Sequence, residues 1–378
     1  MVYSNFKESV KKLVLPKSTG ILLVVFCTLL GYALSFSIIK SNLVQYTSQH
    51  LKYHLQVQDE RTHNPATFEL KVKPMLGLDS MNKKETILWS EDYEHGMLFN
   101  ANPAFLIWTF LICAMIAIAS GTVPFFVFKI LELKIAFGFT YKKILMGGFF
   151  FAALMCFFLW WTNQLDLGYI KPSDIINKFN ILFKYGNFVN QLVTANLILI
   201  VPGMALMFLI GAASDKIYYT AKTGITDSDT ARKETVEIAV KRIKLLNQLL
   251  QTSLQILATI VAFTVLTSSA LGEAIRSAIH IEGIEVFPKQ IPYIYGMYFT
   301  FFLSVLYIPI YYYLGNNYNK LKELASEPGY ITDSATWYTA LFGEVKFEKS
   351  GIENLKLALT LLAPILTSFL PKTLDLMK

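Results

Sequence analysis

The sequence predicts an all-α integral membrane protein: a bundle of six transmembrane helices, a small extracytoplasmic β-containing insertion and a helical cytoplasmic module. Three observations lead to this class. Of the 378 residues, 54% are hydrophobic and only 16% are charged, whereas a soluble domain has about 45–50% and about 25%. The apolar residues form blocks of about 20, the length of a membrane-spanning helix. The basic residues, which give a net charge of +7, lie between these blocks.

Six apolar blocks give the expected spans, which are residues 20–39, 104–128, 144–162, 193–213, 252–271 and 293–314. The first follows a basic leader, residues 1–19, but it is about twice as long as the core of a signal peptide and lacks a cleavage site, so we expect an uncleaved anchor. The three cysteines, Cys27, Cys113 and Cys156, all lie within the blocks. Their number and spacing favour neither a disulfide framework nor a metal motif.

The basic residues predict that both termini lie in the cytoplasm. With the N-terminus inside, 22 of the 34 lysines and arginines fall in inside segments and 12 outside. Seven of those 12 belong to the long segment 40–103, and long loops contribute little to orientation. Lysine outnumbers arginine 30 to 4, which indicates an AT-rich bacterial genome. We therefore expect a multi-pass protein of the bacterial inner membrane.

The three outside segments are 40–103, 163–192 and 272–292. The first is large enough for a small folded element. Residues 54–58 and 68–73 alternate between apolar and polar, as half-buried strands do. We expect two to four short strands in this insertion.

The two longest inside segments are 214–251 and the tail 315–378. In the first of these, apolar residues recur at helical spacing: Val236, Val240, Ile243, Leu246 and Leu250. No proline or glycine separates them from the fifth span. The fifth helix is therefore expected to extend about twenty residues into the cytoplasm, as one rod of about 60 Å at 1.5 Å per residue.

The sequence lacks the motifs of an enzyme. It has no phosphate-binding loop, no dinucleotide fingerprint, no nucleophile elbow and no HExxH motif. No span has an ionisable residue near its centre, whereas proton-coupled mechanisms usually need one. Basic residues do not cluster with aromatics as in nucleic-acid binding. We expect no enzyme, no cofactor and no nucleic-acid partner.

All five histidines lie in outside segments: His50, His54, His63, His95 and His280. Two interpretations are open. His50 and His54 could share a helix face and hold zinc or copper with further ligands. Alternatively, all five are solvated, and because no paired motif fixes a geometry, we expect no metal.

The fifth span carries polar residues along one face, and the pore-lining candidates are Gln248, Thr252, Gln255, Thr259, Ala262 and Ser269. The opposite face is apolar: Leu254, Leu257, Ile260, Val261 and Val265. Polar groups within a membrane need water or another helix to satisfy them. The pattern therefore indicates either the wall of a pore or helix–helix packing, since Ser and Thr commonly join membrane helices.

A second feature is the pair Pro202–Gly203 in the middle of the fourth span. Proline and glycine are tolerated in membrane helices, so a static kink is one interpretation. The other is a hinge that moves.

The C-terminal tail contains an apolar run, 355–370, that cannot stay exposed to water. It is expected to adhere to the membrane or to dock on the bundle. In the second case Leu357, Leu361, Ile365 and Phe369 are candidates for gating or oligomerisation.

Together these features predict an oligomeric channel or regulated membrane-permeabilising effector, gated from the cytoplasm. The layout is similar to that of several kinds of bacterial channel, sensor and membrane-acting antiviral defence effector. The alternative is a non-conducting sensor or scaffold that binds a cytoplasmic partner through 214–251. The expected partners are the lipid bilayer, further copies of the chain, and a cytoplasmic protein or small-molecule regulator.

Overall fold

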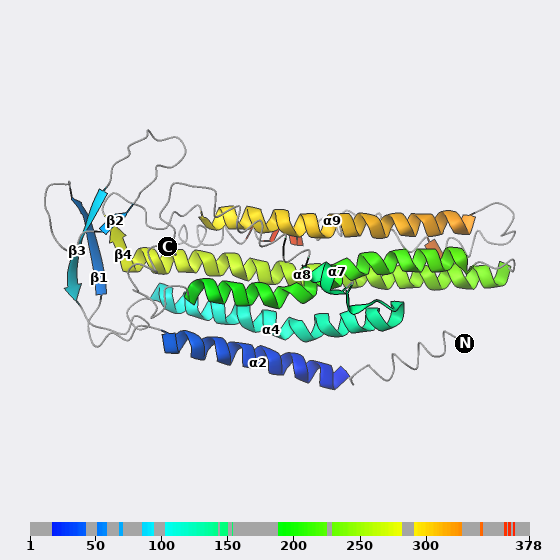
Figure 1. Ribbon diagram of the computed structural model, residues 1–378, viewed down its shortest axis with the longest axis horizontal. Coiled ribbons are helices and arrows are strands. Elements are labelled where there is room, and N and C mark those ends of the chain that lie inside the picture. Colours follow the sequence, from blue (N-terminus) through cyan, green and yellow to red (C-terminus); the bar gives the residue numbers. More distant parts are fainter. Residues whose placement is uncertain are drawn as a thin grey trace.

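The computed structural model describes residues 17–42, 51–58, 68–70, 85–93, 103–142, 144–149, 153, 188–224, 229–281, 291–326, 341–342, 359–360, 362–363 and 366. Within this part of the chain, five long helices lie side by side along the long axis of the molecule (Figure 1). They are α2 (Lys17–Asn42), α4 (Pro103–Phe137), α7 (Phe188–Thr223), α8 (Asp229–Ala278) and α9 (Ile291–Ser326). All five are long and apolar enough to cross a membrane, which supports the prediction of a helical membrane protein.

These helices cover five of the six expected spans, and the third, 144–162, lies largely outside the described residues. Residues 144–149 and 153 are helical. A Cβ at Gly147 would lie 2.4 Å from Cδ1 of Phe208 in α7, so this short segment packs closely on α7. The third span itself stays a prediction.

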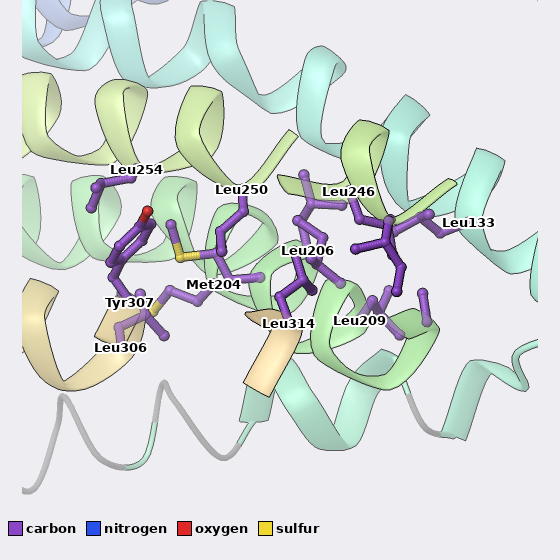
Figure 2. Packing of buried hydrophobic residues seen from close by; sticks show 14 of the residues in the cluster. Leu133, Met204, Leu206, Leu209, Leu246, Leu250, Leu254, Leu306, Tyr307 and Leu314 are labelled. Carbon is purple, nitrogen blue, oxygen red and sulfur yellow. The ribbon is translucent and has the colours of Figure 1, made fainter. Parts of the chain in front are cut away.

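The helices share a core in which α8 is central. It packs against α4, α7 and α9, and α2 packs on α4. Figure 2 shows buried side chains from four helices meeting: Leu133 of α4, Met204, Leu206 and Leu209 of α7, Leu246, Leu250 and Leu254 of α8, and Leu306, Tyr307 and Leu314 of α9. The apolar face of α8 that the sequence indicates is therefore the face buried in the bundle.

α8 is one uninterrupted helix of 50 residues, or about 75 Å, as its unbroken pattern predicts. It is not a lone rod. α7 and α9 continue alongside it past the ends of α2 and α4 (Figure 1). Val236 and Ile243 are buried in the same core as Ile217 of α7 and Leu321 of α9, because all three helices keep apolar faces toward one another to their ends.

The described strands form one sheet at the end of the bundle where α8 ends (Figure 1), which we call the sheet end. They are β1 (Leu51–Gln58), β2 (Phe68–Leu70), β3 (Glu85–Tyr93) and β4 (Ile279–Ile281), in the order β2-β3-β1-β4. β1 pairs antiparallel with β3 and parallel with β4, and β2 pairs antiparallel with β3. Most of 40–103 lies outside the described residues, so the folded insertion stays a prediction.

The packing at Gly203 gives a first testable expectation. A Cβ at this position would lie 2.9 Å from Cζ of Phe126 and 3.0 Å from Cδ2 of Leu257. Gly203→Ala should therefore lower the free energy of unfolding by about 1–3 kcal/mol through overpacking. The measurement is reversible unfolding of the purified protein in detergent.

Gly211→Ala in the same helix is the matched control. Its Cβ would meet only Cγ2 of Ile310 at 3.8 Å, so the substitution should be neutral or stabilise by up to about 1 kcal/mol through helix propensity. Equal losses at both glycines would contradict the packing described here.

Candidate functional site

The exposed side chains of α8 lie on a single line. Wherever α8 has described side chains, the exposed ones are Glu234, Lys241, Leu245, Gln248, Thr252, Gln255 and Thr259. From Lys241 onward the steps between them alternate strictly between four and three residues. The remaining side chains with a described burial are buried or half-buried. α8 therefore presents one narrow face outward from the bundle.

Four consecutive members of this line are polar and uncharged: Gln248, Thr252, Gln255 and Thr259, here called the polar face. On the other side of the helix, Leu254, Leu257 and Ile260 are each only 1% exposed. The exposed side chains that the other helices turn outward over their apolar spans include Leu29 of α2, Phe110 of α4, Ile198 of α7, and Phe301 and Val305 of α9. Those large apolar side chains suit lipid, and the polar face does not.

Contacts between helices indicate the depth of the polar face. The apolar span of α2, Gly20–Ile39, is about 30 Å long, the thickness of the hydrocarbon core of a bilayer, and Gly31 lies next to its midpoint. A Cβ at Gly31 would lie 2.7 Å from Oγ of Ser120, so α4 crosses the mid-plane near Ser120. Met115, five residues closer to the sheet end, accepts a hydrogen bond of 3.3 Å from Thr264 of α8.

Thr264 therefore lies about 7 Å to the sheet side of the mid-plane. α8 rises by 1.5 Å per residue, so Thr259 lies close to the mid-plane. Gln255 lies about 6 Å from the mid-plane, on the side away from the sheet. Thr252 lies about 10 Å beyond, and Gln248 about 16 Å beyond. Since half the hydrocarbon thickness is about 15 Å, all but Gln248 fall within it.

The hydroxyl groups of the polar face are satisfied and its amides are not. Thr252 Oγ1 donates to the carbonyl oxygen of Gln248 at 3.0 Å, and Thr259 Oγ1 donates to that of Gln255 at 2.8 Å. Within the described part of the chain, the side-chain amides of Gln248 and Gln255 have no hydrogen-bond partner. An unsatisfied amide in hydrocarbon costs several kcal/mol. Gln255 therefore needs water or a polar partner outside the described residues.

The structure separates the other pore-lining candidates from this face. Ala262 is half-buried, and Ser269 is only 7% exposed, on the bundle side of α8. At 3.6 residues per turn, Ala262 and Ser269 lie about 60° and about 80° around the helix from Thr259, toward the bundle. The tail candidates Leu357, Leu361, Ile365 and Phe369 lie outside the described residues.

The hinge candidates Pro202 and Gly203 lie inside α7, which stays helical on both sides of them. Gly203 is buried and lies close to Phe126 of α4 and Leu257 of α8. The absence of a side chain at Gly203 is what allows α7 to approach both helices. In this structure the pair marks a close contact between three helices.

A polar cluster joins α7 to α9 at the end opposite the sheet. Asn317 Nδ2 donates to Ser214 Oγ at 2.6 Å and to Asp215 Oδ1 at 3.1 Å, and Tyr313 donates through its hydroxyl to Asp215 Oδ2 at 2.5 Å. Asn317 and Ser214 are buried. No local pattern indicates this cluster, since Tyr313 fits an interfacial tyrosine belt and Asp215 lies about a hundred residues before it.

The same end of the bundle is also tied to α4. Lys216 Nζ donates to the carbonyl oxygen of Phe137, the last residue of α4. Gly138 follows with a φ of +60°, and Phe139 N–H donates to Lys134 O at 3.1 Å, the pattern of a glycine-terminated helix. α4, α7 and α9 are therefore held together by polar contacts where their apolar spans end.

Metal ligands do not gather in the part of the chain that is described. It contains no group of three or more His, Cys, Asp or Glu side chains placed to hold an ion. The backbone register of β1 and β4 pairs His54 with His280, and the side chains of both lie outside the description. The polar face is accordingly the candidate site.

No family model matches the chain, and no curated protein or solved structure is significantly similar to it. The assignment of the site rests on burial, depth and hydrogen bonding of this chain's own residues. Such a face can line a path for water or ions, or it can pair with an equally polar surface.

The α7–α9 cluster yields the next expectation. Asn317→Ala removes the hydrogen bonds to Ser214 and Asp215 and should lower the free energy of unfolding by about 1–2 kcal/mol. The neighbouring Asn316 is exposed, so Asn316→Ala should change stability by less than about 0.5 kcal/mol. A double-mutant cycle with Ser214→Ala measures the coupling, and a coupling of zero would contradict the shared hydrogen bond.

Proposed function

We propose that this protein is an oligomeric channel of the bacterial inner membrane, in which the polar faces of α8 from several copies line an aqueous pore. The observation that carries the proposal is the exposure of Gln255 and Thr259, at a height along the bundle that we infer to lie within the hydrocarbon. In a lipid-facing position, the Gln255 amide would have no hydrogen-bond partner. In a water-filled lumen the same amide is hydrated at no such cost.

The division of surfaces supports this arrangement. Exposed apolar side chains on α2, α4 and α9 suit lipid, whereas α8 offers polar groups at the same depth. A protomer with one polar wall and otherwise apolar walls buries the polar wall when several copies surround a common axis. Uncharged glutamine and threonine favour passage of water or ions without a proton-coupled step.

We further propose that the end opposite the sheet lies in the cytoplasm, with both termini inside. Lys129, Lys134, Lys216, Lys222 and Lys320 lie on the helices at that end, as the positive-inside rule requires of a cytoplasmic face. Gating would act there, where α7, α8 and α9 project together. The apolar tail with Leu357 and Leu361 would dock against these projecting helices and stabilise the closed state.

The second candidate is a non-conducting sensor or scaffold. The observation in its favour is the exposed part of α8 past the membrane, where Glu234, Lys241 and Leu245 face outward. A cytoplasmic protein could bind this surface. In that case the polar face packs dry between copies and carries no current.

Channel recording with charged thiol reagents tests the first candidate. Starting from a variant without Cys27, Cys113 and Cys156, the purified protein in a planar bilayer should give discrete currents. In Gln255→Cys or Thr259→Cys, a charged water-soluble thiol reagent should reduce these currents, because the added charge lies in the lumen.

Leu257→Cys is the buried control and Val305→Cys the lipid-facing control, and the reagent should leave both unaffected. Absence of current from preparations of folded, membrane-inserted protein would contradict the pore. Equal block at all positions would contradict it as well.

Orientation has its own test. Reporter fusions after Ser41 and Lys178 should be active outside the cytoplasm, and fusions after Lys222 and Lys378 should be active inside. A cytoplasmic signal at Lys178 would refute the six-helix topology with both termini inside.

A further inference from the structure

Three lysines gather where α4 ends and the chain turns back along α7. They are Lys134, Lys142 and Lys216, here called the lysine cluster. Lys216 Nζ donates to the carbonyl oxygen of Phe137, and Lys134 Nζ lies 3.1 Å from the centre of the Tyr141 ring. Lys142 follows Tyr141 and is exposed. Within the described part of the chain, none of the three lysines forms an ion pair.

The described carboxylates near the lysine cluster are engaged elsewhere. Glu132 pairs with Lys129 at 2.7 Å, and Asp215 accepts hydrogen bonds from two side chains of α9. The bond from Lys216 to the last carbonyl of α4 offsets the partial negative charge of a helix C-terminus, which is about half an elementary charge. The lysine cluster therefore keeps most of its positive charge.

The lysine cluster lies at the height of the lipid headgroups. Lys134 follows Ser120 by 14 residues along α4, which places it about 21 Å from the mid-plane. The headgroup layer of a bilayer extends to about 20–22 Å from the mid-plane. Lysine ammonium groups reach this layer on their long side chains. The ring of Tyr141, which is 64% exposed, suits the same layer.

The surface next to the lysine cluster, on its membrane side, is apolar. Gly147 lies against Phe208 and the next residue lies against Ala205, so residues 144–149 run toward the mid-plane. The exposed side chains of this segment are large and apolar: Leu145, Met146 and Phe149. A positively charged patch beside an apolar surface matches the two parts of a phospholipid with a negative headgroup.

We propose that the lysine cluster binds the headgroup of an anionic glycerophospholipid, whose acyl chains lie on the apolar side chains of 145–149. Lysine ammonium groups form charge-assisted hydrogen bonds with phosphate oxygens, and basic pockets between membrane helices favour such headgroups. A zwitterionic headgroup carries no net charge to balance the three lysines. The proposal rests on the depth inferred above and requires no pore, so it is independent of the proposed channel.

Native mass spectrometry of the delipidated full-length protein, released from detergent micelles, tests the site. Phosphatidylglycerol should bind at least tenfold more tightly than phosphatidylcholine with the same acyl chains. Each lysine near an anionic headgroup contributes about fivefold, so Lys134→Gln combined with Lys142→Gln should remove most of this preference. Lys142→Gln alone changes an exposed side chain, which leaves the fold intact, and should lower the affinity for phosphatidylglycerol about fivefold.

Lys222→Gln combined with Lys322→Gln is the matched control. Both lysines are exposed at the same end of the bundle and lie outside the lysine cluster, so this pair removes the same charge. It should change the affinity for phosphatidylglycerol by less than about twofold, because screened charges outside the site contribute little.

Three results would overturn the proposal. Equal affinity for the two lipids would show that the headgroup charge is not recognised. Equal losses from the two lysine pairs would reduce the effect to general attraction between opposite charges. Displacement of phosphatidylglycerol by millimolar inorganic phosphate would assign the lysine cluster to a soluble anion. None of these measurements depends on current, so a protein that never conducts can still confirm the lipid site.

Discussion

An amide in hydrocarbon must find a hydrogen-bond partner, and Gln255 has none within the described part of its own chain. Over their apolar spans, the neighbouring helices instead expose leucine, isoleucine and phenylalanine. This contrast distinguishes the polar face of α8 from the lipid-facing surfaces of the other helices. At hydrocarbon depth, an amide facing lipid would leave several kcal/mol of desolvation uncompensated, and this cost is the reason for proposing water or another copy at α8.

The fold explains why that face is turned outward. α4, α7 and α9 cover the apolar sides of α8, and Gly203 allows α7 to lie against Leu257. At the end opposite the sheet, the bonds of Asn317 and Tyr313 to Ser214 and Asp215 hold α7 and α9 together. The bundle therefore fixes the rotation of α8, and the side that the described helices leave uncovered is the polar one.

Much of this could be predicted from the sequence and some could not. Apolar block length predicted the five long helices, and the opposed polar and apolar sides of α8 followed from residue periodicity. Ser269 was grouped with the polar residues because spacings of three and four residues were taken to share one face, although at 3.6 residues per turn Ser269 lies about 80° around the helix from Thr259. The pairing of Asn317 with Ser214 depends on a contact across about a hundred residues, which no local pattern encodes. The third span and the tail remain predictions.

Collision accessibility of a nitroxide spin label attached at Gln255 is the most direct measurement of the central claim. In lipid bilayers, a water-filled lumen predicts high accessibility to a polar nickel reagent, and a dry contact between polar faces predicts low accessibility to both nickel and oxygen. Labels at Val305 and Leu257 provide the lipid-facing and buried references. In either state, the accessibility of a label at Gln255 to nickel and oxygen should differ from that of a label at Val305. A label at Gln255 that shows high oxygen and low nickel accessibility, like Val305, would mean that lipid covers the polar face and would contradict the account.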